Sequence, residues 1–172
     1  MNEKMAGLPS AVVHAIPLRF TTVDFPRLVR STLEPLNREA MARDVTLAVD
    51  SPEDISVVAD PEKIAWAVAT LVGNALRYVR HGTHRLPGGS ILVRIRRGPR
   101  NEGVVIDVAD DGPGIPKDAL ATLFERRPGE AHAVGLALKL VLDIVTAHGG
   151  SVTVESSTEP DAHGTTVRVT LP

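Results

Sequence analysis

The order of helical and strand patterns along this chain excludes a regular alternation of strand, helix and strand. The expected helices cover residues 23–41, 61–79, 116–126 and 134–150. The expected strands cover residues 45–49, 55–59, 90–97, 103–110, 151–157 and 165–172. Pairs of strands separated by helices favour an α+β fold, in which helices cover one face of a mixed, mostly antiparallel sheet as a two-layer sandwich.

The length of the chain allows one domain with its own core, preceded by a short tail. Residues 1–21 are weakly patterned and are interpreted as a tail or linker remnant, and residues 22–172 as the folded domain. Aromatic residues make up only 3% of the sequence. The core is therefore expected to consist of valine, leucine, isoleucine and alanine.

Charge and composition exclude several classes of function. A net charge of -2 gives no electrostatic reason to expect nucleic acid or an anionic membrane as a partner. The arginines of residues 94–100 are interpreted instead as the exposed edge of a sheet. The absence of cysteine excludes disulfides and thiolate catalysis. No apolar run approaches the roughly 20 residues that span a bilayer, so a cytoplasmic location without direct membrane contact is expected.

The helix expected at residues 61–79 carries two neighbouring stripes. Asp60 can cap it, and Pro61 suits its first turn. The apolar stripe, which should pack on the sheet, contains Ile64, Val68, Leu71, Ala75 and Val79. The polar stripe beside it contains Lys63, Trp66, Thr70, Asn74 and Arg77. Asn74 has two interpretations, a chance residue on a solvated helix side or an amide directed at a bound cation or water.

A carboxylate continues the apolar face of the strand expected at residues 103–110. Asp110 follows Ile106 and Val108 in the alternation, and burial of a carboxylate is costly without hydrogen-bond donors. One interpretation is that Asp110 caps the following turn. A calcium loop that starts at Asp107 is excluded because Ala109 would stand at a ligand position and two prolines would lie inside the loop. A dinucleotide fingerprint is excluded because Lys117 stands where its third glycine belongs.

Several motifs occur together and in a fixed order. They read LVGNALRYV (71–79), VADDGPGIP (108–116), LFER (123–126), VGLALKLVLDIVTAHGG (134–150) and GTTVRVTLP (164–172). This combination resembles the ATP-binding catalytic domain of bacterial sensor histidine kinases, in the GHKL or Bergerat-fold ATPase superfamily shared with gyrase. The similarity covers roughly residue 22 to the C-terminus.

The resemblance implies a site for ATP and Mg²⁺. Asp110 matches the acid that accepts the exocyclic amine of adenine, and Thr165 a residue that helps to hold the same edge through water. Asn74 matches the amide that binds Mg²⁺ between the phosphates, Arg77 a basic residue facing phosphate, and Tyr78 a ring against the base. The rest of the implied nucleotide site consists of Gly112, Gly114, Ile115, Gly135 and Leu136.

The resemblance also implies a reaction and partners. The γ-phosphate would pass to a histidine on a separate dimerisation domain, with Asn74 and Arg77 as catalytic residues and a response regulator downstream. The domain could then be the cytoplasmic part of a membrane-anchored sensor. His14 lacks the neighbours of an acceptor histidine.

Three departures from the family pattern leave alternatives open. Ala133 and Ala137 replace residues that the family fills with glycine, and the lid between Phe124 and Gly135 is short. Thr70 stands where gyrase-like members have a glutamate that activates water, so transfer is expected over hydrolysis. The alternatives are a degenerate regulatory module without kinase activity and an anti-sigma-type serine kinase.

Overall fold

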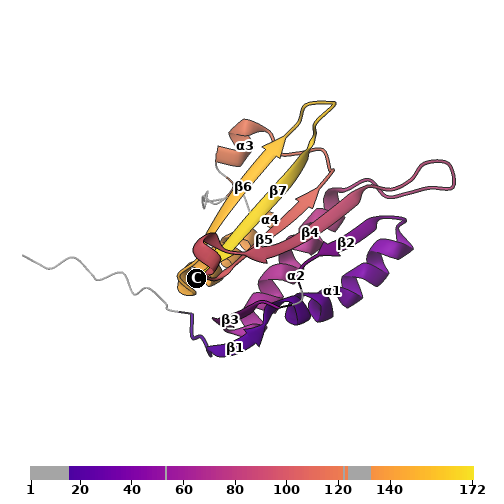
Figure 1. Cartoon of the computed structure of the whole chain (residues 1–172). Coiled ribbons are helices and arrows are strands. Elements are labelled where there is room, and N and C mark those ends of the chain that lie inside the picture. The colour runs from indigo at the N-terminus through magenta and orange to yellow at the C-terminus, as the bar shows by residue number, and fades with distance from the viewer. Residues whose placement is uncertain (1–15, 53, 122, 124–132) are drawn as a thin grey trace, which may run out of the picture.

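The computed structural model describes residues 16–52, 54–121, 123 and 133–172. A sheet forms one layer and the long helices form the other (Figure 1). The helices are α1 (Phe25–Ala42), α2 (Pro61–Tyr78), α3 (Lys117–Ala121) and α4 (Ala133–Ala147), with a 3-10 turn at Pro99–Asn101. The strands are β1 (Thr21–Asp24), β2 (Thr46–Asp50), β3 (Ser56–Ala59), β4 (Ser90–Arg97), β5 (Val104–Asp110), β6 (Ser151–Ser157) and β7 (Gly164–Leu171).

The main sheet has five strands in the order β2-β4-β5-β7-β6. Strands β2 and β4 are parallel, and the other three pairings are antiparallel. Strands β1 and β3 pair with each other in a separate antiparallel ribbon. The predicted α+β class with a mixed, mostly antiparallel sheet is confirmed.

Alternation along the strands creates the core between the two layers. In β5, Ile106 and Val108 face the helices and are fully buried. From the helix layer, Ile64 and Leu71 of α2 belong to the same apolar cluster. The core is aliphatic as predicted, with Phe25 at the start of α1 as its fully buried aromatic residue.

Helix α2 begins where the sequence places its cap. The Asp60 carboxylate accepts hydrogen bonds from the backbone N–H groups of Glu62 and Lys63, each at 3.1 Å, and Pro61 occupies the first helical position. The backbone N–H of Asp60 donates to Nε2 of the buried His148 at 3.0 Å. The start of α2 is thereby joined to the end of α4.

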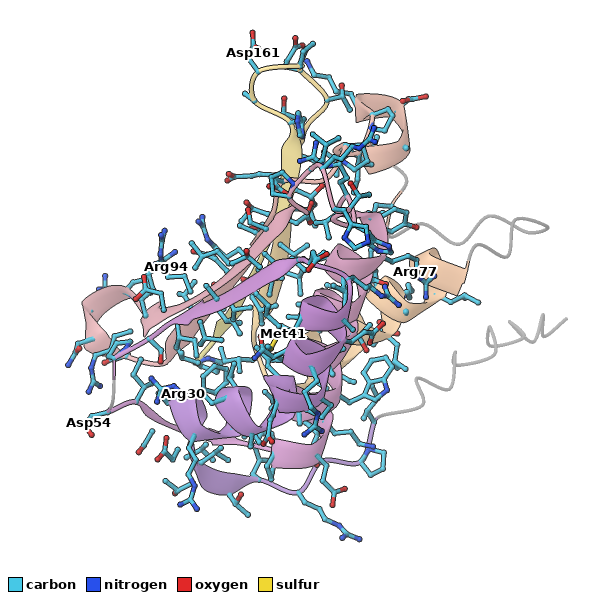
Figure 2. The ribbon with its side chains drawn as sticks, turned by 90° about the vertical axis from the view of Figure 1, so that its right-hand side faces the viewer. Arg30, Met41, Asp54, Arg77, Arg94 and Asp161 are labelled. Atoms are coloured by element: carbon cyan, nitrogen blue, oxygen red, sulfur yellow. The ribbon has the colours of Figure 1, made fainter. Side chains whose placement is uncertain are left out.

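Two expectations were wrong. The helix predicted from Val23 begins at Phe25, because Thr21–Asp24 pairs with β3 and Asp24 caps α1 by accepting from the N–H of Arg27. The expectation of an exposed sheet edge was wrong for Arg94, where β2 still pairs with β4, but it holds for Arg96 and Arg97, which lie beyond the last residue that β2 pairs with. Arg94 projects from the sheet on the opposite side of the molecule from Arg77 (Figure 2).

Candidate functional site

Three polar residues complete the helix-facing side of neighbouring strands. Asp110 of β5 lies opposite Thr165 of β7, and Thr165 lies opposite Ser156 of β6. The preceding row on the same face consists of Val108, Val167 and Val154. An apolar face therefore ends in a polar row, which we call the terminal row (Asp110, Thr165 and Ser156).

Asp110 is half-buried and only partly satisfied by its surroundings. One carboxylate oxygen accepts from the Gly112 N–H at 2.9 Å. Desolvation raises the pKa of Asp110, and the neighbouring Asp111 adds to the effect, while the backbone N–H groups of Gly112 and Thr165 oppose it. A carboxylate offers about four lone-pair positions, so capacity remains for a donor from outside the chain.

The turn after Asp110 is packed too tightly for side chains at its glycines. Gly114 has a φ of +77°, and a Cβ there would lie 1.9 Å from the Ser157 carbonyl oxygen. A Cβ at Gly112 would meet the Asp110 carboxylate at 2.8 Å and the Tyr78 backbone at 3.5 Å. The turn thus lies between the end of α2 and the hairpin of β6 and β7, and the Ile115 N–H fixes it by donating to Ser156 Oγ at 2.8 Å.

The polar stripe of α2 brings a second set of groups to the same end of the sheet. Asn74 Nδ2 is buried and has no hydrogen-bond partner among the residues that the structure describes. One turn further on, Arg77 is exposed and Tyr78 is half exposed. Figure 2 shows Arg77 projecting away from the sheet. A buried polar atom without a partner is costly in a folded protein and points to a group from outside the chain.

The residues present fit a nucleotide-bound magnesium ion better than a metal cage. Over the described ranges no group of three or more His, Cys, Asp or Glu side chains gathers to hold a metal. Mg²⁺ typically keeps several waters and is bound by one or two protein oxygens together with substrate phosphates. The Asn74 amide can present its oxygen by a rotation of 180°, since nitrogen and oxygen exchange places in such a flip.

The remaining predicted residues are placed only in part. Gly135 lies in the first turn of α4, which begins at Ala133, and Leu136 and Ala137 follow it with Leu136 exposed. Helix α4 packs against α2, the helix that carries Asn74. Phe124, most of the predicted lid and His14 lie outside the described residues.

A groove of about 640 Å³ lies elsewhere, between α1 and β2, and is lined by Leu33, Glu34, Leu47 and Val49 among others. Strand β4 separates this groove from β5, the strand of Asp110. We give more weight to the terminal row than to the size of the groove. The row contains a carboxylate of raised pKa, and α2, whose last residue lies against the turn after Asp110, carries a buried amide without a partner among the described residues. The charged residues of the groove lie on the surface of α1.

Sequence reasoning missed two residues of this region. Ser156 bonds both to the turn and to Thr165, and His163 Nδ1 donates to the Gly112 carbonyl oxygen at 2.7 Å. Alternation with Val152 and Val154 would have placed Ser156 on the inner face. No signal in the sequence points from His163 to Gly112, because the two residues meet only through the folding of β7 onto β5.

Comparison with known proteins identifies the family of the chain. The profile of the histidine kinase-, DNA gyrase B- and HSP90-like ATPases matches residues 59–172, which include the whole terminal row and Asn74. The chain belongs to this ATPase family. Over 156 residues it is 29% identical to the adaptive-response sensory kinase SasA of Synechococcus elongatus, an alignment that covers 87% of this chain and 38% of SasA.

Solved structures show the same fold. The mycobacterial sensor histidine kinase MprB superposes with a TM-score of 0.72 and 27% identity, covering 90% of this chain and 97% of that structure. Full-length ShkA, in complex with AMPPNP, superposes with a TM-score of 0.74 and 25% identity over 92% of this chain and 32% of that one. The predicted membership of the histidine kinase ATPases is confirmed, and the domain is an ATP-binding catalytic domain of that kind.

The chain spans well under half the length of the curated relatives that it matches. Within the described residues, none of the helices combines the length and apolar character needed to cross a bilayer.

Proposed function

We propose that this domain binds Mg²⁺-ATP at the terminal row and donates the γ-phosphate to a histidine on a separate dimerisation domain. A response regulator would then receive the phosphate from that histidine. The proposal extends the family membership of the chain to the activity of a whole sensor kinase, of which it would be one part.

The terminal row provides the base end of this site. Asp110 accepts a hydrogen bond from the adenine amine, and Thr165 beside it contacts the same edge of the base. Gly112 and Gly114 keep the backbone of the turn within contact distance of the ligand, and Ile115 closes it. Tyr78, half exposed at the end of α2, supplies an aromatic ring against the base.

The phosphate end lies along α2 and at the start of α4. Asn74 would hold the Mg²⁺ that accompanies the phosphates, and the exposed Arg77 would stabilise their charge. Gly135 and Leu136 lie at the N-terminal end of α4, where backbone N–H groups favour an anion. The magnesium ion, when bound, would neutralise charge that develops on the γ-phosphate during transfer.

Transfer is favoured over hydrolysis by the residue one turn before Asn74. Thr70 has no carboxylate, so it cannot take a proton from an attacking water at neutral pH. The nucleophile is then the histidine nitrogen of the acceptor domain. A bond forms between that nitrogen and the γ-phosphorus as the bond to the bridging oxygen breaks, and ADP leaves.

The observation that carries the proposal is a feature that Asp110 and Asn74 share. Each is a polar side chain at the boundary of an aliphatic core, and each has unused hydrogen-bonding capacity. One ligand with an amine at one end and a magnesium-bound polyphosphate at the other would satisfy both. ShkA, with the same fold, has been crystallised with AMPPNP, a nucleotide of this class.

Thermal unfolding with and without nucleotide tests the proposal. ATP or ADP should raise the melting temperature, and Mg²⁺ should increase the effect of ATP, because a ligand that binds only the folded state stabilises it. Replacing Asn74 by alanine should remove the magnesium-dependent part of the shift. The absence of any shift at millimolar nucleotide would favour the alternative, a regulatory module that has lost nucleotide binding.

The boundaries and cellular setting are part of the same proposal. Residues 22–172 would form the catalytic domain and residues 1–21 the connection to the preceding part of the sensor. A kinase that uses ATP and passes phosphate to a response regulator would work in the cytoplasm.

A further inference from the structure

We infer that Ser156 fixes the direction of the Thr165 hydroxyl and thereby makes the base end of the site selective for a 6-amino purine. Ser156 is a positioning residue in this inference, since it acts through Thr165. The inference rests on the proposed function, because it concerns the nucleotide that binds at the terminal row.

Ser156 Oγ makes three polar contacts, each with a different partner. It lies 2.8 Å from the Ile115 backbone nitrogen, 2.9 Å from the Gly164 carbonyl oxygen and 2.7 Å from Thr165 Oγ1. The Ile115 N–H can only donate, and the Gly164 carbonyl can only accept. The Thr165 hydroxyl can do either, so its role depends on the other two contacts.

One assignment of protons satisfies all three contacts. The single hydroxyl proton of Ser156 goes to Gly164, and its two lone pairs receive the N–H of Ile115 and the hydroxyl proton of Thr165. Thr165 is then a donor toward Ser156. Its remaining lone pairs make it an acceptor toward anything bound beside Asp110.

The terminal row consequently presents acceptors on two adjacent strands. Ionised Asp110 has no proton to donate, and Thr165 has committed its own. A water that bridged the two would donate one proton to each and would present lone pairs to the ligand. An exocyclic amine suits this surface, whereas a 6-carbonyl oxygen would face lone pairs and lose its hydrogen bonds to water without replacement.

A comparison of three nucleotides distinguishes selectivity for a 6-amino group from binding of any purine nucleotide. ATP carries an amine at C6, inosine triphosphate a carbonyl, and purine riboside triphosphate only hydrogen. The dissociation constant of each with Mg²⁺ is measured for the wild-type chain and for Ser156→Ala by calorimetry. The ratio of inosine triphosphate to purine riboside triphosphate affinity reports on the carbonyl contact alone.

Ser156→Ala releases the Thr165 proton, which can then be donated to a carbonyl. We expect this ratio to rise about fivefold in favour of inosine triphosphate, the factor given by one hydrogen bond of ordinary strength. Ser156→Thr keeps the hydroxyl and should preserve the wild-type ratio. Thr165→Val, combined with Ser156→Ala, should abolish the gain because it removes the released donor.

Ser157→Ala is the matched control, because Ser157 is the adjacent residue of β6 and its hydroxyl accepts from the Glu159 N–H in the hairpin loop, away from Thr165. Ser157→Ala should leave the ratios between the three nucleotide affinities unchanged. The melting temperature of each unliganded variant shows that it is folded. If Ser156→Ala unfolds, Thr165→Val alone carries the test. It should leave the ratio of inosine triphosphate to purine riboside triphosphate affinity unchanged, because Thr165 donates its proton to Ser156, and a fall in that ratio would overturn the inference.

The outcomes separate the two proposals. An unchanged ratio in folded Ser156→Ala, with ATP still bound, overturns the role of Ser156 and leaves the nucleotide site intact. Failure of the wild-type chain to bind any of the three nucleotides contradicts the proposed function, and the inference with it.

Discussion

The side chain of Asp110 lies where the chain would be more stable with a neutral residue. Its pKa is raised chiefly by desolvation, so the folded state disfavours the charged form that predominates at neutral pH. The direction in which stability changes with pH follows from the difference between the folded and unfolded pKa values. Ionised Asp110 lowers the stability of the folded state, and this cost disappears as the pH falls through the pKa and the group becomes neutral.

Asp110→Asn should therefore separate stability from binding. Asparagine can still accept from the Gly112 N–H, so the unliganded variant should melt at the wild-type temperature or above it at pH 7. It should lose the stabilisation by ATP, which is about 2.7 kcal/mol when the ligand is at 100 times its dissociation constant. Differential scanning fluorimetry with and without Mg²⁺-ATP measures both effects.

Asp161→Asn is the control, since Asp161 is exposed in the loop between β6 and β7 (Figure 2). It should change neither quantity. A nucleotide shift that survives in Asp110→Asn would mean that the base binds elsewhere.

Replacement by alanine should lower the stability by different amounts at two glycines that have similar φ angles. Gly114 and Gly149 have φ values of +77° and +76°. A Cβ at Gly149 would come no closer than 3.7 Å, to a side-chain carbon of Pro172, whereas one at Gly114 would clash with backbone. Gly149→Ala should cost about 1–2 kcal/mol from its φ alone. Gly114→Ala should cost clearly more in urea denaturation, and equal costs would show that the turn can move away.

At the scale of whole elements, Asp60 joins the segment before β1 to the start of α2. Its carboxylate accepts from the N–H of Arg19 at 2.8 Å as well as from the first turn of α2. The Arg19 hydrogen bond is the largest cause that lowers the pKa of Asp60, and its burial opposes this. The stabilisation is present above the unfolded value of 3.8 and is lost as the pH falls through the lower pKa of the folded state.

Asp60→Asn should retain the cap but lose this pH dependence. Asparagine caps helices well, but its amide NH2 takes the place of Oδ2 and cannot accept from the Arg19 N–H. The loss at pH 7 should therefore be about 1–3 kcal/mol, from the missing charge at the helix terminus and the lost Arg19 hydrogen bond. In urea denaturation between pH 2 and 7, the difference from wild type should be constant at neutral pH and should shrink below pH 3.8. A difference that grows on acidification would contradict the lowered pKa.

His148 ties α4 to the same point through both ring nitrogens. Nε2 accepts the Asp60 N–H, and Nδ1 donates to the Ile144 carbonyl oxygen at 2.8 Å. His148→Ala leaves a buried N–H unpaired and should cost about 1–3 kcal/mol or more of unfolding free energy in chemical denaturation. His81→Ala, at an exposed position, should be close to neutral. Similar losses in both variants would show that the hydrogen bonds between His148 and the start of α2 make no specific contribution to stability.

The elements themselves were largely readable from the sequence, and the exceptions have local causes. Helix α2 was predicted to within a residue of its end because its cap, its proline and its apolar stripe agree. Strand β1 was missed because four residues are too short for alternation to stand out from the helix that follows. Its identity depends on β3, whose edge it covers.

At the scale of the whole molecule, local patterns alone could not show which groups meet. The resemblance predicted Asn74, Asp110 and Thr165 as parts of one site, but the place of Ser156 beside Thr165 depends on strand register. Register in turn depends on how β7 pairs with β5, a strand far from it in the sequence, and on the packing of α2 and α4 on the sheet. These are contacts between distant segments, for which the local pattern carries no signal.

Hydrogen exchange can show whether the ligand binds at the terminal row or in the groove between α1 and β2. Mg²⁺-ATP should slow exchange of backbone amides in the second half of α2, in the turn at residues 111–116 and in the hairpin of β6 and β7, because binding orders these segments together. The amides of α1 and β2 around the 640 Å³ groove should exchange as before. Protection confined to α1 and β2 would place the nucleotide in the groove and leave the carboxylate of Asp110 without a ligand.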